Sequence, residues 1–352
     1  MGTRLVSGKT FMELFMTGRE LVKKTLRFEE VERLPRTLCM TPNIWMFRED
    51  ELAQFYRRFP DDTTFTTKLR YGQSPYFRGT PNRKGSFTDE FGCEWHTFVD
   101  GVCGEVKKGP LQSMADLDAY KLPWELLDGA DFSGQNEAYK STDKYIIAGS
   151  LTRPFERMQF LCGTEELYTY IAEENPMFFK LLEMLHEFNV RELKMVAAQA
   201  VDGVSFMDDW GSQTSLLISP LTWRKYFKPM YREYCEIIHA AGKDVFFHSD
   251  GRIELIYGDL VEIGVNAINS QLWCMDMEAL GDKYAGKIAF WGGVDRQYAL
   301  PRGTEEDVRK NVRRMGKALL KKGHTGLFAE MSWEGSTPLA NALAAFDEFE
   351  KI

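Results

Sequence analysis

His248 and Asp250 give the sharpest chemical signal in this sequence. His248 ends the apolar run VFF at 245–247, and Asp250 follows after a single serine. A turn at Gly251 can bring the imidazole and the carboxylate to one centre, where they share a divalent metal or act as an oriented acid/base pair. The alternative is a hydrogen-bonded histidine in the core.

Two adjacent carboxylates, Asp208 and Asp209, follow an earlier apolar run and precede Trp210. Neighbouring carboxylates repel each other unless one is neutral, paired or bound to a metal. One of them can serve as a general base or accept a hydrogen bond from substrate, while the other caps the next turn. Both are predicted as catalytic together with His248, and the alternative is that both simply cap loops.

Further polar residues come directly after other apolar runs. Each has an ordinary explanation as a helix cap or a turn residue, but their repetition after successive runs favours a shared site. The residues predicted to bind substrate are Ser150, Trp210, Asn269, Gln271 and Asp295, and Glu330 and Glu334 follow the last run.

Short apolar runs alternate with longer amphipathic stretches from about residue 144 onward. The runs are 144–150, 202–209, 243–250, 265–271, 287–295 and 325–332, and helix-start signals at Ser219, Thr304 and Thr337 lie between or after them. Alternation of this kind indicates βαβ units and a parallel sheet. Two earlier runs, 36–47 and 62–71, bring the predicted strands to eight.

Eight parallel strands with intervening helices form a closed (β/α)8 TIM barrel, whose polar strand ends meet at one mouth. Residues 72–143 are then a long insertion, rich in Gly, Pro and aromatic residues, and we expect it to cover that mouth. An open doubly wound sheet is the alternative. The chain has neither a G-x-G-x-x-G motif after a first strand nor a phosphate-binding loop, so the barrel is favoured.

Composition limits the class of partner. The chain has 352 residues, 44% hydrophobic and 27% charged, with a net charge of -8, which suits a globular protein with a large core. The acidic balance argues against nucleic acid. The sequence has no long uncharged stretch and no signal peptide, and its six scattered cysteines read as reduced thiols. We therefore expect a cytoplasmic protein that acts on a small molecule.

Several motifs together resemble the uroporphyrinogen decarboxylase superfamily. They are DGVSFMDDWG from 202, FWGGVDRQYALPRGT from 290, DEFGCEWHTF from 89, LTRPFERMQFLCG from 151 and STPLANALAAFDEF from 336. The resemblance implies one barrel domain over residues 1–352, with an N-terminal extension and the insertion, and it makes a homodimer plausible. Two chemistries are known in this superfamily: decarboxylation of uroporphyrinogen, and zinc-assisted methyl transfer involving corrinoids.

The resemblance is weaker for true decarboxylases. Those members resemble one another in a P-V-W-x-M-R-Q-A-G-R segment whose arginines hold acidic substrate groups, and LCMTPNIWMFRED at 38–50 has neither arginine at that spacing. Neutral residues cannot replace such charge-assisted bonds. The DEFGCEW segment instead looks like the D-E-W-G-x-x-W of methyltransferase-like members, which implies a corrinoid-linked methyltransferase.

The zinc ligands implied by that branch are altered here. Methyltransferases of the family carry H-x-C and a later Cys, whereas this chain has His248, Asp250 and, near the second position, Glu330. These N and O donors still suit zinc, which would then act on an oxygen such as that of a methoxyl group. The corrinoid (methylcobalamin) would arrive on a separate partner protein. Decarboxylation of a tetrapyrrole or small acid, and a non-catalytic ligand-binding protein, remain the alternatives.

Overall fold

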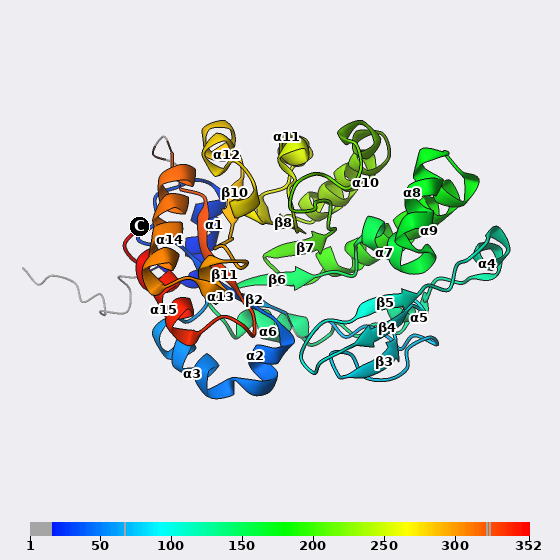
Figure 1. The fold of residues 1–352 in the computed structure, drawn as a ribbon, viewed down its shortest axis with the longest axis horizontal. Coiled ribbons are helices and arrows are strands. Elements are labelled where there is room, and N and C mark those ends of the chain that lie inside the picture. Colours follow the sequence, from blue (N-terminus) through cyan, green and yellow to red (C-terminus); the bar gives the residue numbers. More distant parts are fainter. Residues whose placement is uncertain (1–15, 67, 322, 324) are drawn as a thin grey trace, which may run out of the picture.

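Eight parallel strands form a nearly closed barrel in the computed structural model, which describes residues 16–66, 68–321, 323 and 325–352 (Figure 1). The strand order is β1-β11-β10-β9-β8-β7-β6-β2, and every hydrogen-bonded neighbour is parallel. The (β/α)8 prediction is confirmed. The strands are β1 (Arg36–Met40), β2 (Thr63–Phe65), β6 (Tyr145–Gly149), β7 (Gly203–Met207), β8 (Asp244–Ser249), β9 (Ala267–Ser270), β10 (Ala289–Trp291) and β11 (Leu327–Trp333).

The six runs from residue 144 onward each contain one strand of the barrel, as predicted. The two earlier runs were predicted too long. The strand in 36–47 ends at Met40, because Pro42 occupies the first turn of helix α2 (Pro42–Phe47), where its fixed φ favours helix. The strand in 62–71 is confined to residues 63–65.

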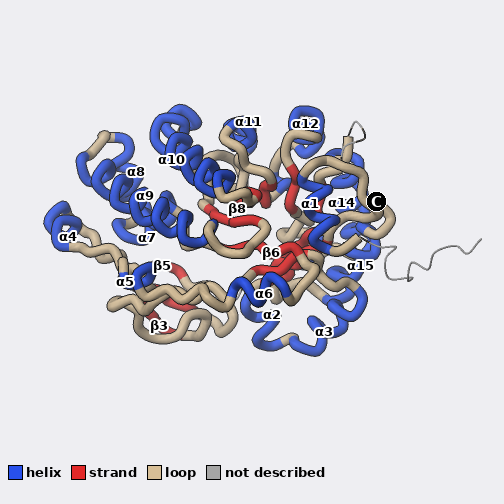
Figure 2. Tube along the Cα trace, turned by 180° about the vertical axis from the view of Figure 1, so that it is seen from behind, coloured by secondary structure: helices blue, strands red, loops and turns tan. Residues whose placement is uncertain are grey.

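Helices surround the strands (Figure 2). Two of the predicted start signals are confirmed: Ser219 caps α10 through the Thr222 amide, and Thr304 forms a capping box with Asp307 at the start of α14. Thr337 does not cap α15, which has Pro338 at the N-cap. The outer helices are α3 (Glu49–Arg58), α7 (Pro154–Cys162), α8 (Thr164–Ala172), α9 (Pro176–Ala197), α10 (Pro220–Ala240), α11 (Glu254–Glu262), α12 (Met277–Tyr284), α13 (Ala299–Arg302), α14 (Glu305–Leu319) and α15 (Leu339–Phe349).

Helix α1 (Gly18–Leu26) closes the end of the barrel at which the strands begin. Its Leu21 and Val22 are fully buried, and Val22 packs with lumen side chains such as Phe246. Arg19 and Lys23 form ion pairs of 3.0 and 3.2 Å with Asp202, which lies just before β7. The described part of the N-terminal extension thus closes this end of the barrel, and ligands cannot enter the lumen there.

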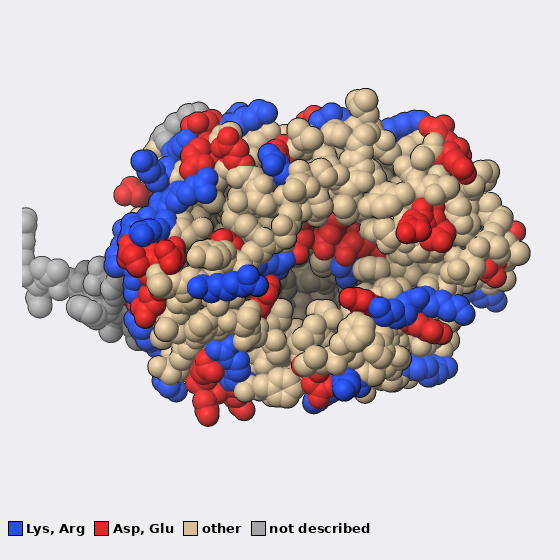
Figure 3. Space-filling view, viewed as in Figure 1, with Lys and Arg blue, Asp and Glu red and all other residues tan. Residues whose placement is uncertain are grey.

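The insertion between β2 and β6 carries structure that its sequence did not predict. Strands β3 (Gly85–Thr88), β4 (Glu94–Thr97) and β5 (Glu105–Lys108) form an antiparallel sheet, followed by α4 (Met114–Ala119), α5 (Glu125–Asp128) and α6 (Gln135–Lys140). Asp89 fixes this unit to α7 by accepting a hydrogen bond of 2.7 Å from Arg157, and it also accepts from the Cys93 amide. The insertion lies along one side of a hollow edged with acidic side chains (Figure 3).

No helix among the described residues combines the length and apolarity that crossing a membrane would require.

Candidate functional site

Asn269 at the end of β9 fixes the orientation of His248 at the end of β8. The amide nitrogen of Asn269 donates to the carbonyl of Trp291, so its oxygen faces the imidazole, 2.6 Å from Nδ1 of His248. Nδ1 must therefore carry the proton. In the neutral ring this leaves the lone pair of Nε2 free to bind a metal or a proton.

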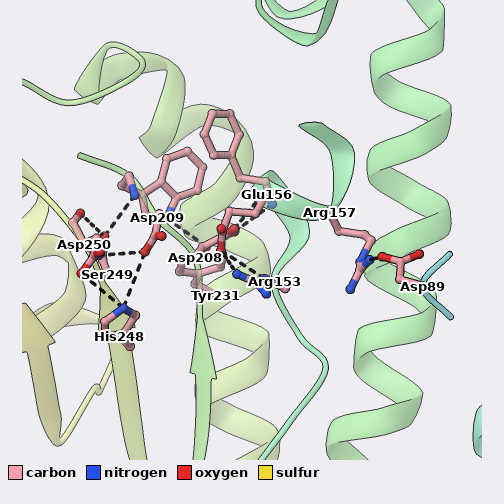
Figure 4. A network of polar contacts seen from close by, with 12 residues as sticks. Asp89, Arg153, Glu156, Arg157, Asp208, Asp209, Tyr231, His248, Ser249 and Asp250 are labelled. Carbon is pink, nitrogen blue, oxygen red and sulfur yellow. Dashed lines mark hydrogen bonds and ion pairs between the residues drawn. The ribbon is translucent and has the colours of Figure 1, made fainter. Parts of the chain in front are cut away.

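Two carboxylates face that free nitrogen (Figure 4). Asp209 Oδ1 lies 3.7 Å and Asp250 Oδ1 lies 3.6 Å from Nε2 of His248. The Asp250 amide donates to Asp209 Oδ1 at 2.8 Å, which holds the two strand ends together. Within the described part of the chain, these are the three residues whose ligand atoms gather within 4.8 Å of one another.

The spacing of these three groups is compatible with a three-ligand metal site. Bonds of about 2.0–2.1 Å in a tetrahedral arrangement place ligand atoms about 3.3 Å apart, close to the separations seen here. Burial and the charge of Glu156 raise the pKa of Asp209 to about 6, and His248 acts in the opposite direction. A cation between the three groups would offset the repulsion between Asp209 and the neighbouring carboxylates and would leave one coordination position for substrate.

Glu330 is not the third member of this cluster, although the sequence predicted it as a metal ligand. Its side chain is 3% exposed on β11 and accepts a hydrogen bond from Asn269. Burial raises the pKa of Glu330 to about 8, while Arg296 and Asn269 lower it. Asp209 takes the place predicted for Glu330, and Glu330 stands beside the cluster as a carboxylic acid that keeps its proton near neutral pH.

Gly292 makes room for Glu330. Its φ is +95°, and a Cβ at this position would lie 1.7 Å from Oε2 of Glu330 and 2.8 Å from Nδ2 of Asn269. Both a left-handed backbone and the absence of a side chain are required here.

A cavity of about 310 Å³ in the barrel lumen adjoins these groups. His248, Asn269 and Glu330 supply polar groups to its wall, and Ser150 lies there as predicted. Most of the wall is apolar, and no Lys or Arg among the described residues lines it. The remaining lining residues are Thr37, Leu38, Cys39, Phe65, Gly149, Ser205, Phe206, Met207 and Trp291.

Asp208 and Trp210 lie in the core, away from the cavity wall. Asp208 is fully buried and accepts hydrogen bonds from the amides of Phe155 and Glu156 and from the hydroxyl of Tyr231. It caps the first turn of α7, which agrees with the alternative that Asp208 has a capping role. Trp210 is fully buried and stacks on Phe155 with ring centroids 4.2 Å apart, so it has no surface to offer a substrate.

Asp295 and Gln271 also lie outside the cavity wall. Asp295 accepts hydrogen bonds from the amides of Gln297 and Tyr298 and organises the turn into α13. Gln271 is buried against a small space of about 20 Å³, lined also by Asp250 and Glu330, on the other side of the acidic groups. This space suits a water molecule better than a substrate.

Arg296 is the main residue that the sequence did not single out. Its guanidinium pairs with Asp250 and lies 3.5 Å from Glu334. Burial raises the pKa of both Glu330 and Glu334, and the positive charge of Arg296 lowers both pKa values. The signal in the sequence was a cation directly after a strand-end aspartate, in the segment GGVDR at 292–296.

Cys39, Phe65 and Trp291 complete the site. The side chain of Cys39 on β1 is exposed to the cavity, and desolvation by the protein around that cavity together with Glu330 raises the pKa of its thiol to about 12, so it stays protonated. Phe65 and Trp291 stack with centroids 6.1 Å apart. Trp291 lines the cavity, whereas Phe155, Trp210 and Trp333 are fully buried core residues.

The barrel and its acidic strand ends are those of the uroporphyrinogen decarboxylase superfamily, and the family comparison agrees. The uroporphyrinogen decarboxylase (URO-D) family model matches residues 88–344, so the chain belongs to this family. No curated protein sequence matches the chain.

Among solved structures, a methyltransferase from Methanosarcina mazei superposes with a TM-score of 0.68 at 15% identity, covering 96% of this chain and 99% of that one. This likeness confirms the fold. A xylanase from Gloeophyllum trabeum (TM-score 0.43, 10% identity, 89% and 96% covered) and one from Thermoanaerobacterium saccharolyticum (0.41, 10%, 87% and 86%) also match.

Proposed function

We propose that this protein is a methyltransferase that removes the methyl group of a small methoxyl compound and passes it to a corrinoid carried by a separate protein. The observation that carries the proposal is the cluster of Asp209, His248 and Asp250 beside an apolar cavity that also holds Glu330. The full-length likeness to the Methanosarcina mazei methyltransferase supports it.

Asp209, His248 and Asp250 would hold a zinc ion. The free Nε2 lone pair of His248, the 3.6–3.7 Å separations and the mixed N and O donors fit such an ion. Zinc bound there would polarise the methoxyl oxygen as a Lewis acid. Asn269 keeps the imidazole in the required tautomer, and the ion pair with Arg296 holds Asp250 in place.

Glu330 would supply the proton that the reaction needs. When the bond between methyl carbon and oxygen breaks, the oxygen must take up a proton to leave as a neutral hydroxyl group. The raised pKa of about 8 keeps Glu330 protonated at neutral pH, and its carboxyl group lies in the cavity wall. Asn269 and the space left by Gly292 position it there.

The cavity favours this substrate class over the macrocycle that names the family. A tetrapyrrole rich in carboxylates needs a large site lined with cations, whereas this cavity of about 310 Å³ has no Lys or Arg in its wall within the part of the chain that the structure describes. Phe65, Trp291 and Met207 suit the hydrocarbon body of a small methyl ether, aliphatic or with a single ring.

The test has two parts. Protein prepared without chelators is analysed for metal, and methylation of cob(I)alamin is followed with a panel of methoxyl compounds. We expect close to one zinc per chain and methyl transfer from at least one compound. The His248→Ala and Asp250→Ala variants should each bind zinc with an affinity lower by tenfold or more.

His186→Ala is the matched control, because His186 also pairs with a carboxylate, Glu233 at 2.9 Å, but on the outer helices. It should keep both metal and activity. Zinc-free protein with no methyl transfer across the panel would overturn the proposal. Loss of carboxyl groups from uroporphyrinogen in the same preparation would then establish the decarboxylase alternative, and an inert barrel would favour ligand binding alone.

A further inference from the structure

The barrel has a seam between β1 and β2. These two strands end the sheet order, and no ladder between them exists in the described residues. They are joined near their beginnings by the bond from the Asp62 amide to the Arg36 carbonyl (2.9 Å) and by the bond from Thr63 Oγ1 to Thr37 Oγ1 (2.6 Å). Beyond these bonds the strands share few contacts.

A second cavity, of about 380 Å³, lies on the outer side of this seam. Tyr56 of α3 and Pro60 form its outer wall. Thr37, Leu38 and Phe65 line both this seam pocket and the barrel cavity. These shared side chains lie between the two spaces, and Phe65 is 48% exposed, unlike a packed lumen residue.

The seam pocket contains a carboxyl group, that of Asp61, which is only partly hydrogen-bonded. Oδ1 of Asp61 is buried and has no hydrogen-bond partner. Burial raises the pKa of Asp61 to about 7, while hydrogen bonds from Tyr56 and from the backbone of Leu38, together with the charge of Lys144, lower it. A buried acceptor left unpaired costs free energy, so a ligand that brings a donor gains by filling this position.

A donor stands across the same pocket. Lys144 lines it, and its ammonium group has no hydrogen bond to any residue that the structure describes. Leu38, Tyr56, Pro60 and Phe65 provide apolar walls between the two polar groups. A hydroxyl group can donate to Asp61 and accept from Lys144, while a short hydrocarbon body packs on the walls.

We infer that the seam pocket is a second ligand site, which takes a small alcohol or phenol. Its role rests on the proposed function: cleavage of a methyl ether, with the methyl group passing to the corrinoid and a proton to the oxygen, leaves a hydroxyl compound. The ether has no hydrogen to donate to Asp61, and the product has one. The pocket therefore discriminates product from substrate and, lying beyond Phe65, gives the product a way out that avoids a partner docked at the mouth.

Phenol and methoxybenzene are a matched pair of probes, because they differ by the methyl group. Binding is followed by NMR on the full chain without corrinoid, through the methyl group of Thr64, which lines the seam pocket but not the barrel cavity. Met207 lines the barrel cavity but not the seam pocket, and its methyl group reports binding there. We expect saturable phenol shifts at Thr64 and weak or absent shifts with methoxybenzene.

Asp61→Leu removes the acceptor and should weaken phenol binding at Thr64 about tenfold or more, the usual effect of one hydrogen bond to a charged group. Asp143→Leu, an exposed acid beside Lys144, is the control and should leave it unchanged. If Asp61→Leu does not fold, Lys144→Met should still weaken phenol binding.

No phenol effect at Thr64, or equal affinities in wild type and Asp61→Leu, would overturn the inference. Asp61-dependent phenol binding in a protein that transfers no methyl group would instead disprove the proposed function and leave a site for alcohols and phenols.

Discussion

Glu330 shows how one buried carboxyl group acquires a chemical role. It is enclosed by β11, Gly292 and Asn269, and the resulting desolvation keeps its proton several pH units above the point where an exposed glutamate loses it. The nearby carboxylates of Asp209 and Asp250 are less buried than Glu330, and the pKa of Asp209 is raised only to about 6. Under the proposed function, these different surroundings would divide one acidic site into a proton donor and a metal-binding pair.

The Glu330→Gln variant tests that division. Wild-type methyl transfer should fall as the pH rises through about 8, because the acid form is lost, and the variant should be slower by roughly 10²–10⁴-fold without that alkaline limb. The measurement is kcat between pH 6 and 9.5. Glu334→Gln, which removes a half-buried carboxylate beside Arg296, should keep the limb. A limb that survives in Glu330→Gln would assign it to another group.

The end of β7 directs two neighbouring carboxylates to opposite tasks. Because successive strand residues point to opposite sides, Asp208 turns outward to the first turn of α7 and Asp209 turns toward His248. The sequence showed the pair but not which member did which task. That assignment depends on where α7 begins relative to β7, which is a matter of tertiary packing.

Gly292 lets β10 end close against β11, and its replacement has a measurable cost. Gly292→Ala combines an unfavourable positive φ with a Cβ that collides with Glu330, so we expect a loss of about 2–4 kcal/mol in unfolding free energy. Gly242→Ala is the matched control, since its φ is +71° but no atom lies within 4 Å of the new Cβ. It should lose only about 1–2 kcal/mol. Equal losses in urea denaturation would show that the collision is relieved.

The barrel itself was predictable because strand and helix periodicities alternate plainly after residue 144. The insertion was not, since β3, β4 and β5 are short and exposed and lack a buried face with a clear period. His248 and Asp250 were found because each follows an apolar run. The sequence predicted Glu330 where the structure has Asp209, because distances across the mouth depend on how the strands are staggered. The contacts of Arg296 with Asp250 and of Cys39 with Glu330 were not predictable, because these partners are distant in sequence.

The stability of the whole molecule should decrease as the pH rises from about 4 to about 8. The pKa values of Asp61, Asp208 and Glu330 are raised to about 7, 8 and 8, so between about pH 4 and 8 the folded chain holds protons that the unfolded chain has lost. The unfolding free energy therefore falls with increasing pH. Carboxylates with lowered pKa, such as Glu278 at about 2, contribute a slope only below about pH 4.5.

Urea denaturation with a chelator present measures this effect. We expect the unfolding free energy at pH 8.5 to be lower than at pH 6.5 by at least about 1 kcal/mol, since one pKa unit corresponds to about 1.4 kcal/mol. Glu330→Gln should reduce the slope, because its amide cannot ionise. A slope of the opposite sign would mean that these acids are ionised in the folded chain.

The pairing of β1 with β11 also sets the order of events during synthesis. Arg36 aligns with Ala329 and Met40 with Trp333, and β1 has no ladder to β2 among the described residues. The first barrel strand therefore has no partner strand among the described residues until residues 327–333 have left the ribosome. A nascent chain that stops before residue 327 should expose the edge of β1 to chaperones or to other chains, and closing the barrel is a late step that the last strand controls.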